Sequence, residues 1–156
     1  MPKQDYSKPS NFGGLAAQSI LPRTDDVAVD PSTGHIYLIH VNDCVVTRIH
    51  AQTKKWELVA GIMGVMGFDN GKALSSTFFA PVKIAWYDGI LYVLDLGAKC
   101  VRSVDFANDL TDVAAGLCFD PASDASDTTK FKSPLKMAVG QTGIVIVGML
   151  LIFVLH

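Results

Sequence analysis

Two 27-residue stretches decide the fold of this chain. Residues 35–61 read HIYLIHVNDCVVTRIHAQTKKWELVAG, and residues 90–116 read ILYVLDLGAKCVRSVDFANDLTDVAAG. They align without a gap, and the second begins 55 residues after the first, so that Tyr92 falls on Tyr37. Self-similarity at a fixed spacing is typical of repeat architectures. The chain is therefore expected to be built from repeats.

The repeat predicts four short strands in each copy. In the second copy these are 82–86, Ile90–Asp95, Cys100–Asp105 and 111–115, which are rich in apolar and β-branched residues. Asp88-Gly89, between the first two strands, is a strong hairpin signal. Four antiparallel strands that recur every ~40–50 residues are typical of a β-propeller blade.

A third, partial copy covers residues 117–148. Its segment 131–138, FKSPLKMA, echoes 79–85, FAPVKIA, of the second copy. After Gly148 the repeat pattern stops, and residues 149–156 form an apolar tail.

Turn and strand residues of the middle copy carry a family signature. Residues 69–73 read DNGKA, 78–81 read FFAP, 91–95 read LYVLD and 101–105 read VRSVD, before the copy closes at Gly116. This pattern resembles the NHL repeat. The resemblance implies an all-β fold, a partial β-propeller of four-stranded antiparallel blades followed by an apolar C-terminal tail. The repeats are expected at 22–61, 62–116 and 117–148, after a polar N-terminal segment, 1–21.

The first copy departs from the signature at one position. His40 stands where the second copy has the acidic residue Asp95. The third copy also lacks the additional glycines found in 61–71. The resemblance is therefore most specific in the middle copy.

Composition excludes several classes of protein. With 156 residues the chain is expected to form a single domain. Apolar residues make up 49% and charged residues 18%, which excludes an intrinsically disordered chain. A net charge of −2 argues against a nucleic-acid-binding protein, which needs a clustered basic surplus.

The N-terminal segment has no apolar core typical of a secretory signal. A cytoplasmic protein is therefore expected, in which Cys44, Cys100 and Cys118 stay reduced. Their spacing matches neither a zinc knuckle nor a CxxC pair, so buried, inert thiols are predicted.

An uncharged stretch of 19 residues runs from Met137 to Leu155. Its length is at the lower limit for a membrane-spanning helix, for which about 17–25 apolar residues are needed. Gly140, Gln141, Thr142 and Gly143 instead predict a turn, followed by a buried strand. The alternative is a membrane-associated protein with a C-terminal anchor.

Two full repeats and part of a third are too few to close a propeller of about four to eight blades. Three explanations are open at this point. The chain is a truncated product of a longer propeller, it pairs with other copies or further blades to complete a ring, or its apolar segment lies in a membrane.

The sequence presents no catalytic, cofactor-binding or metal-binding constellation. His35 and His40 are five residues apart on one predicted strand, so their side chains point to opposite faces and cannot share a metal. His50 lies in another strand, and His156 is the last residue.

The resemblance to NHL-type propellers implies a platform that binds protein or RNA partners at one rim. Some propellers of this type are lyases with a central zinc. Arg48, Lys54 and Lys55 form a small basic group in the first copy and are the candidate rim contacts. The predicted function is therefore a non-catalytic, protein-binding platform without a cofactor. The alternative is a propeller-type lyase or lactonase-like hydrolase with a central metal.

Overall fold

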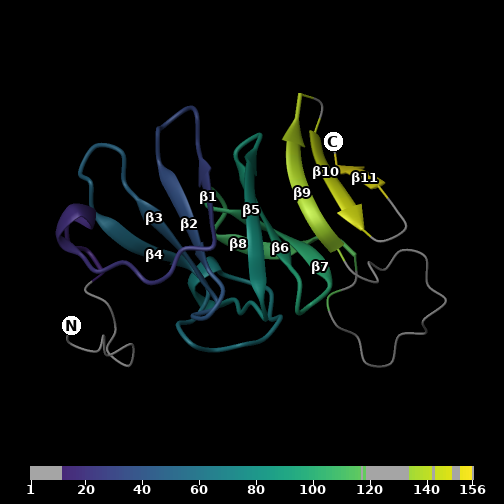
Figure 1. Ribbon diagram of the computed structural model, residues 1–156, viewed down its shortest axis with the longest axis horizontal. Coiled ribbons are helices and arrows are strands. Elements are labelled where there is room, and N and C mark those ends of the chain that lie inside the picture. Colours follow the sequence, from purple (N-terminus) through teal and green to yellow (C-terminus); the bar gives the residue numbers. More distant parts are fainter. Residues whose placement is uncertain (1–11, 117, 119–133, 142, 149–151, 156) are drawn as a thin grey trace.

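Short runs of β-branched and aromatic residues, separated by turn residues, form three antiparallel sheets in the computed structural model (Figure 1). The structure describes residues 12–116, 118, 134–141, 143–148 and 152–155. The first sheet has the order β1 (Asp26–Val29), β2 (Ile36–His40), β3 (Val45–Ile49), β4 (Trp56–Ala60). The second has the order β5 (Pro81–Tyr87), β6 (Ile90–Asp95), β7 (Cys100–Asp105), β8 (Leu110–Ala115). The third has the order β11 (Ile152–Leu155), β10 (Gly143–Gly148), β9 (Pro134–Gly140).

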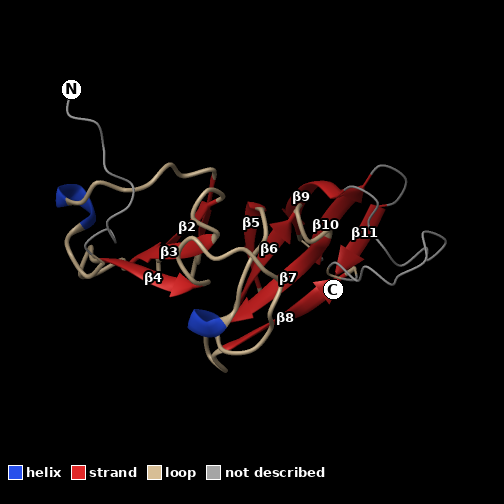
Figure 2. Ribbon diagram, turned by 90° about the horizontal axis from the view of Figure 1, so that it is seen from below, coloured by secondary structure: helices blue, strands red, loops and turns tan. Residues whose placement is uncertain are grey.

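The all-β prediction is confirmed. In the second sheet, β6 and β7 have the predicted bounds, β5 is longer than predicted by one residue at each end, and β8 begins one residue earlier. The two four-stranded antiparallel sheets fit a β-propeller (Figure 2). Within the described residues, no helix has the length and apolar character needed to cross a membrane.

The apolar C-terminal stretch forms strands where the structure describes it. β9 and β10 pair through a turn at Gln141, and Ile152–Leu155 pairs with β10 as β11. The repeat pattern stops at Gly148, yet the tail still adds a strand, because a run of Ile, Phe and Val has high β-propensity. Residues 149–151 and 156 of the tail lie outside the described residues.

The first and second sheets pack face to face around a shared apolar core. Tyr37 of β2 stacks on Trp86 of β5, with ring centroids 5.0 Å apart, and on Phe106, at 5.2 Å. Burying one large apolar side chain stabilises a fold by about 1.5–3 kcal/mol. The contact between the sheets is therefore a main source of stability. Its other buried members include Ile39, Val46, Ile84, Leu91, Val93 and Val104.

Both four-stranded sheets have their outer edge covered in the same way. In the first sheet the Gly13 N–H donates to the Trp56 carbonyl (2.7 Å), and the chain continues into the 3-10 helix η1 (Ala16–Gln18). In the second sheet Gly71 and Thr111 exchange backbone hydrogen bonds of 2.9 and 2.6 Å, before η2 (Ala73–Ser75). Covering an edge strand protects it from pairing with another chain. The described part of the N-terminal segment 1–21 thus belongs structurally to the first sheet.

Arg102 fastens the loop that precedes the second sheet. Its side chain is fully buried and donates to the carbonyls of Thr77 (3.0 Å) and Asp69 (2.8 Å) and to the Asn70 side chain (2.7 Å). The guanidinium also lies over the Phe78 ring, 5.4 Å from its centroid. One side chain thus holds Asp69, Asn70, Thr77 and Phe78 in place.

A lysine cannot reproduce the planar fork of donors at this site. We expect Arg102→Lys to lower the free energy of unfolding by about 2–4 kcal/mol, because buried acceptors lose their donors. Urea denaturation measures this loss. Arg23→Lys, at an exposed arginine that pairs with Asp25, is the matched control and should change stability by less than about 0.5 kcal/mol. Equal effects of the two substitutions would contradict the role given to Arg102.

The expectation that all three cysteines stay reduced is wrong for two of them. Cys100, at the start of β7, forms a disulfide with Cys118, which follows β8. The two strands are antiparallel neighbours, so the residues beyond the end of β8 return to the start of β7. Cys44 is free and buried, as predicted. Disulfides are typical of oxidising compartments.

A disulfide closing a loop of this length stabilises a fold by about 3 kcal/mol. The separation of the two cysteines is 18 residues. We expect a reductant to lower the Tm of the wild-type chain, and the double variant Cys100→Ser/Cys118→Ser to melt at the lower temperature with or without the reductant. Thermal unfolding followed by circular dichroism measures both. Three alkylatable thiols in the oxidised, denatured protein would refute the pairing.

Candidate functional site

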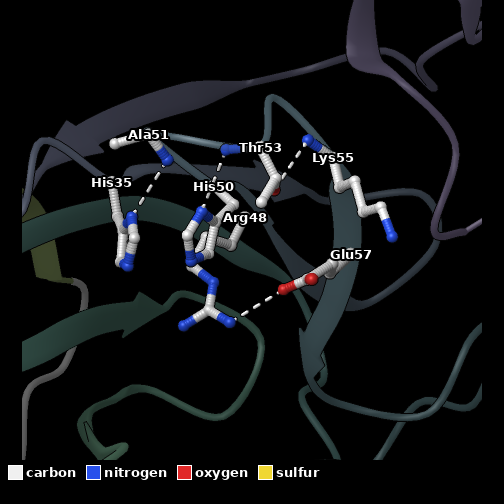
Figure 3. A network of polar contacts seen from close by, with 7 residues as sticks. All are labelled: His35, Arg48, His50, Ala51, Thr53, Lys55 and Glu57. Carbon is white, nitrogen blue, oxygen red and sulfur yellow. Dashed lines mark hydrogen bonds and ion pairs between the residues drawn. The ribbon is translucent and has the colours of Figure 1, made fainter.

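Three strand ends meet at one end of the first sheet and gather most of its basic and imidazole side chains. His35 directly precedes β2, Arg48 and Ile49 end β3, and Glu57 lies at the start of β4. The register places Arg48 opposite Glu57 and Ile49 opposite Ile36. His50, the next residue after β3, therefore lies beside His35 (Figure 3). We call this group the first-sheet end, defined by His35, Arg48, His50, Lys54, Lys55 and Glu57.

The two imidazole rings are in contact, with centroids 4.4 Å apart. The Ala51 N–H donates to His35 Nδ1 (3.1 Å), and the Thr53 N–H donates to His50 Nδ1 (3.4 Å). A ring nitrogen that accepts an N–H carries no proton, so each neutral ring carries its proton on Nε2. Both Nε2 atoms are therefore hydrogen-bond donors.

Electrostatics favour the neutral form of His35. Burial lowers the pKa of the His35 imidazole, and the nearby Arg48 cation and His50 lower it further. Asp30 and Glu57 oppose this shift but do not cancel it. The backbone hydrogen bond to Nδ1 acts in the same direction, because protonation of that nitrogen would break it.

Arg48 is engaged in a half-buried ion pair. Its guanidinium donates to Glu57 at 2.7 Å, and the two side chains are 25% and 34% exposed. Burial alone would lower the pKa of Arg48, but hydrogen bonds to Glu57 and Tyr37 outweigh it and raise the pKa. Arg48 therefore links Glu57 of the first-sheet end to Tyr37 of the aromatic core.

Lys54 and Lys55 lie in the turn between β3 and β4 and are both exposed. Lys54 adopts a left-handed backbone conformation (φ 59°), and its ammonium donates to the Ala51 carbonyl. Figure 3 shows the Lys55 ammonium directed away from the imidazoles, beyond Glu57. The predicted rim contacts thus divide into one supporting residue, Arg48, and two exposed cations.

Chemically, the first-sheet end suits a hydrogen-bond acceptor or an anion. Lys54 and Lys55 are exposed, and His35 and His50 each offer an Nε2–H donor, whereas the Glu57 carboxylate is paired with Arg48. A metal would need the lone pair of Nε2, which the hydrogen bonds to Nδ1 leave protonated. In the part of the chain that the structure describes, no three or more His, Cys, Asp or Glu side chains are grouped to hold a metal ion.

The contact between His35 and His50 was missed by the sequence reasoning, which assigned the two residues to separate strands. The alignment of strands 2 and 3 as a hairpin would have revealed it, because residues that flank a paired position also lie opposite each other. His35 and His40 lie apart, and His35 precedes β2 instead of sharing a strand with His40. His40 is fully buried at the far end of β2, where its ring contacts the Arg23 carbonyl (3.0 Å) and the Thr47 hydroxyl (2.8 Å). His156 lies outside the described residues.

Comparisons with known proteins give the fold alone. No protein-family model and no curated protein sequence matches the chain. A structural-genomics protein of unknown function from Bacteroides thetaiotaomicron VPI-5482 is similar in structure, with a TM-score of 0.64 and 19% identity over 77% of this chain and 31% of that chain. An auxiliary nutrient binding protein from the same organism has a TM-score of 0.62 and 17% identity, over 77% of this chain and 33% of that chain. The chain spans about a third of the length of these two neighbours.

The lowered pKa of His35 has a measurable consequence. The unfolded chain binds a proton near the ordinary pKa of about 6.5, whereas the folded chain binds it only at lower pH. Stability is therefore full above pH ~6.5 and falls as the pH drops from there toward the folded-state pKa. NMR titration of the His35 ring should show a pKa below 6.5. His35→Asn, which keeps an acceptor for the Ala51 N–H, should reduce the acid-side loss of stability, and a His35 pKa above 6.5 would contradict this account.

Proposed function

We propose that this chain forms part of an NHL-like β-propeller and acts as a non-catalytic platform that binds a protein partner through the first-sheet end. The observation that carries the proposal is the pair of exposed lysines, Lys54 and Lys55, in the turn that follows His50. These groups can pair with carboxylates of a partner, and charge complementarity of this kind steers association and fixes register.

Charges on the neighbouring sheet favour an acidic partner segment that is confined to the first sheet. In the second sheet Asp109 takes the place of Lys54 and Asp105 that of His50, and Asp88 lies in the neighbouring β5–β6 turn. Hydrogen bonds from Asn108 lower the pKa of Asp105, which keeps this carboxylate ionised. A carboxylate-bearing segment is therefore attracted by one sheet and repelled by the next.

A protein partner fits these charges better than a nucleic acid does. The exposed cations of the first-sheet end are confined to one turn, and the chain as a whole has a net charge of −2. A polyphosphate backbone would need a longer basic track.

The proposal predicts a site-specific charge effect. A fluorescently labelled, glutamate-rich peptide should bind the wild-type chain at low ionic strength, and Lys54→Glu/Lys55→Glu should weaken binding by about tenfold or more. Fluorescence anisotropy measures the affinity. The matched control is Lys72→Glu/Lys99→Glu, which changes the net charge equally. It also replaces one lysine with positive φ, since φ is 59° at Lys54 and 58° at Lys99.

The control separates a local contact from the effect of net charge. It should change the affinity by less than about threefold, because neither of its lysines lies at the first-sheet end. Equal losses in the two double variants would overturn the proposed contact. Tighter binding of a single-stranded RNA oligomer than of the peptide would replace the protein partner with a nucleic acid.

A further inference from the structure

A groove lies along the innermost strand of each sheet and includes no residue of the first-sheet end. It is lined by residues of β1, β5 and β9, which lie next to one another in Figure 1, and its volume is about 600 Å³. Ligand pockets for small molecules typically have volumes of about 300–1,000 Å³. The groove is therefore large enough for a metabolite of ordinary size.

Free strand edges give the groove a polar lining. In an antiparallel ladder every second residue bonds the partner strand, and the residues between them direct their N–H and C=O groups outward. Among the described residues, β1, β5 and β9 each pair with one strand only, so this outward row faces the groove. The Ile84 N–H of β5 is one of these outward-directed groups, because it donates to the Asp26 carboxylate of β1 (3.0 Å). Backbone donors and acceptors of this kind suit a ligand rich in hydroxyl groups.

The charged side chains of the groove are Asp26, Lys83 and Lys136. The Asp26 carboxylate is already engaged, since it accepts the Ile84 N–H and lies 3.7 Å from the Lys83 ammonium. Lys136 is exposed and has no ion-pair partner among the residues that the structure describes. Two cations against one paired anion leave the groove with a net positive charge.

We propose that this groove binds a small, hydroxylated molecule that carries an oxyanion group, a carboxylate or a phosphate. Lys136 pairs with the oxyanion, Lys83 adds a second cation from the neighbouring strand, and the free strand edges hydrogen-bond to the hydroxyls. The site is independent of the protein-binding role proposed above, because no residue is shared between the two sites.

Three molecules with the same carbon chain length test the proposal. Gluconate carries a carboxylate, glucose 6-phosphate carries a phosphate, and glucose is the neutral control. Isothermal titration of the full chain should show binding of at least one of the two anions, at least about tenfold tighter than glucose, since a charge-assisted hydrogen bond contributes on this scale. The anion that binds identifies the oxyanion. Binding of none of the three, or equal binding of glucose, would overturn the proposal.

Variants locate the binding in the groove. Lys136→Gln should weaken binding of the anion by about tenfold, and Lys72→Gln, at an exposed lysine outside the groove, should leave it unchanged. Thermal unfolding of each variant shows whether the fold is kept. Lys54→Glu/Lys55→Glu should retain anion binding, which separates this site from the first-sheet end. Unchanged affinity in both Lys136→Gln and Lys83→Gln would refute the assignment.

Discussion

Face-to-face packing of the first two sheets is the interaction on which the rest of this structure depends. In β2 the consecutive residues from Tyr37 to His40 are all buried, so this strand is covered on both faces. Tyr37 provides the central contact, since its ring stacks on Trp86 and on Phe106 of the second sheet. This packing sets β1 beside β5 and so forms one wall of the groove. It also places Tyr37 where its side chain interacts with Arg48 of the first-sheet end.

The two complete repeats resemble each other more closely in the backbone conformation of their turns than in their side chains. Cys44 and Lys99 both have positive φ, as do Lys54 and Asp109, and the members of each pair are 55 residues apart. Gly61 and Gly116 follow the same spacing and the same conformation (φ 89° and 80°). At Gly61 an added Cβ would lie 2.6 Å from the Cys44 carbonyl, so only glycine closes the repeat there. The turns are therefore set by repeated backbone geometry, which the sequence marks only at the glycines.

Local sequence signals predicted the strands, but the side-chain contacts needed the register. Asp88-Gly89 marks the hairpin of β5 and β6, and runs of apolar and β-branched residues mark the neighbouring strands. His35 and His50 each lie one residue outside a strand, whereas Cys100 begins β7 and Cys118 lies three residues beyond the end of β8. Such contacts follow from strand pairing and not from the spacing of the residues along the chain. Aligning the predicted strands of each repeat in register would have predicted both contacts.

The two proposed sites differ in the level of structure that creates them. The first-sheet end needs only the pairing of β2, β3 and β4, since its residues flank those strands. The groove needs three separate sheets to be held at fixed positions, because Asp26, Lys83 and Lys136 come from β1, β5 and β9. A change that loosens sheet packing without disturbing pairing within a sheet would therefore affect the groove first. Binding of a ligand across the three strands would, by the same linkage, stabilise the packing of the sheets.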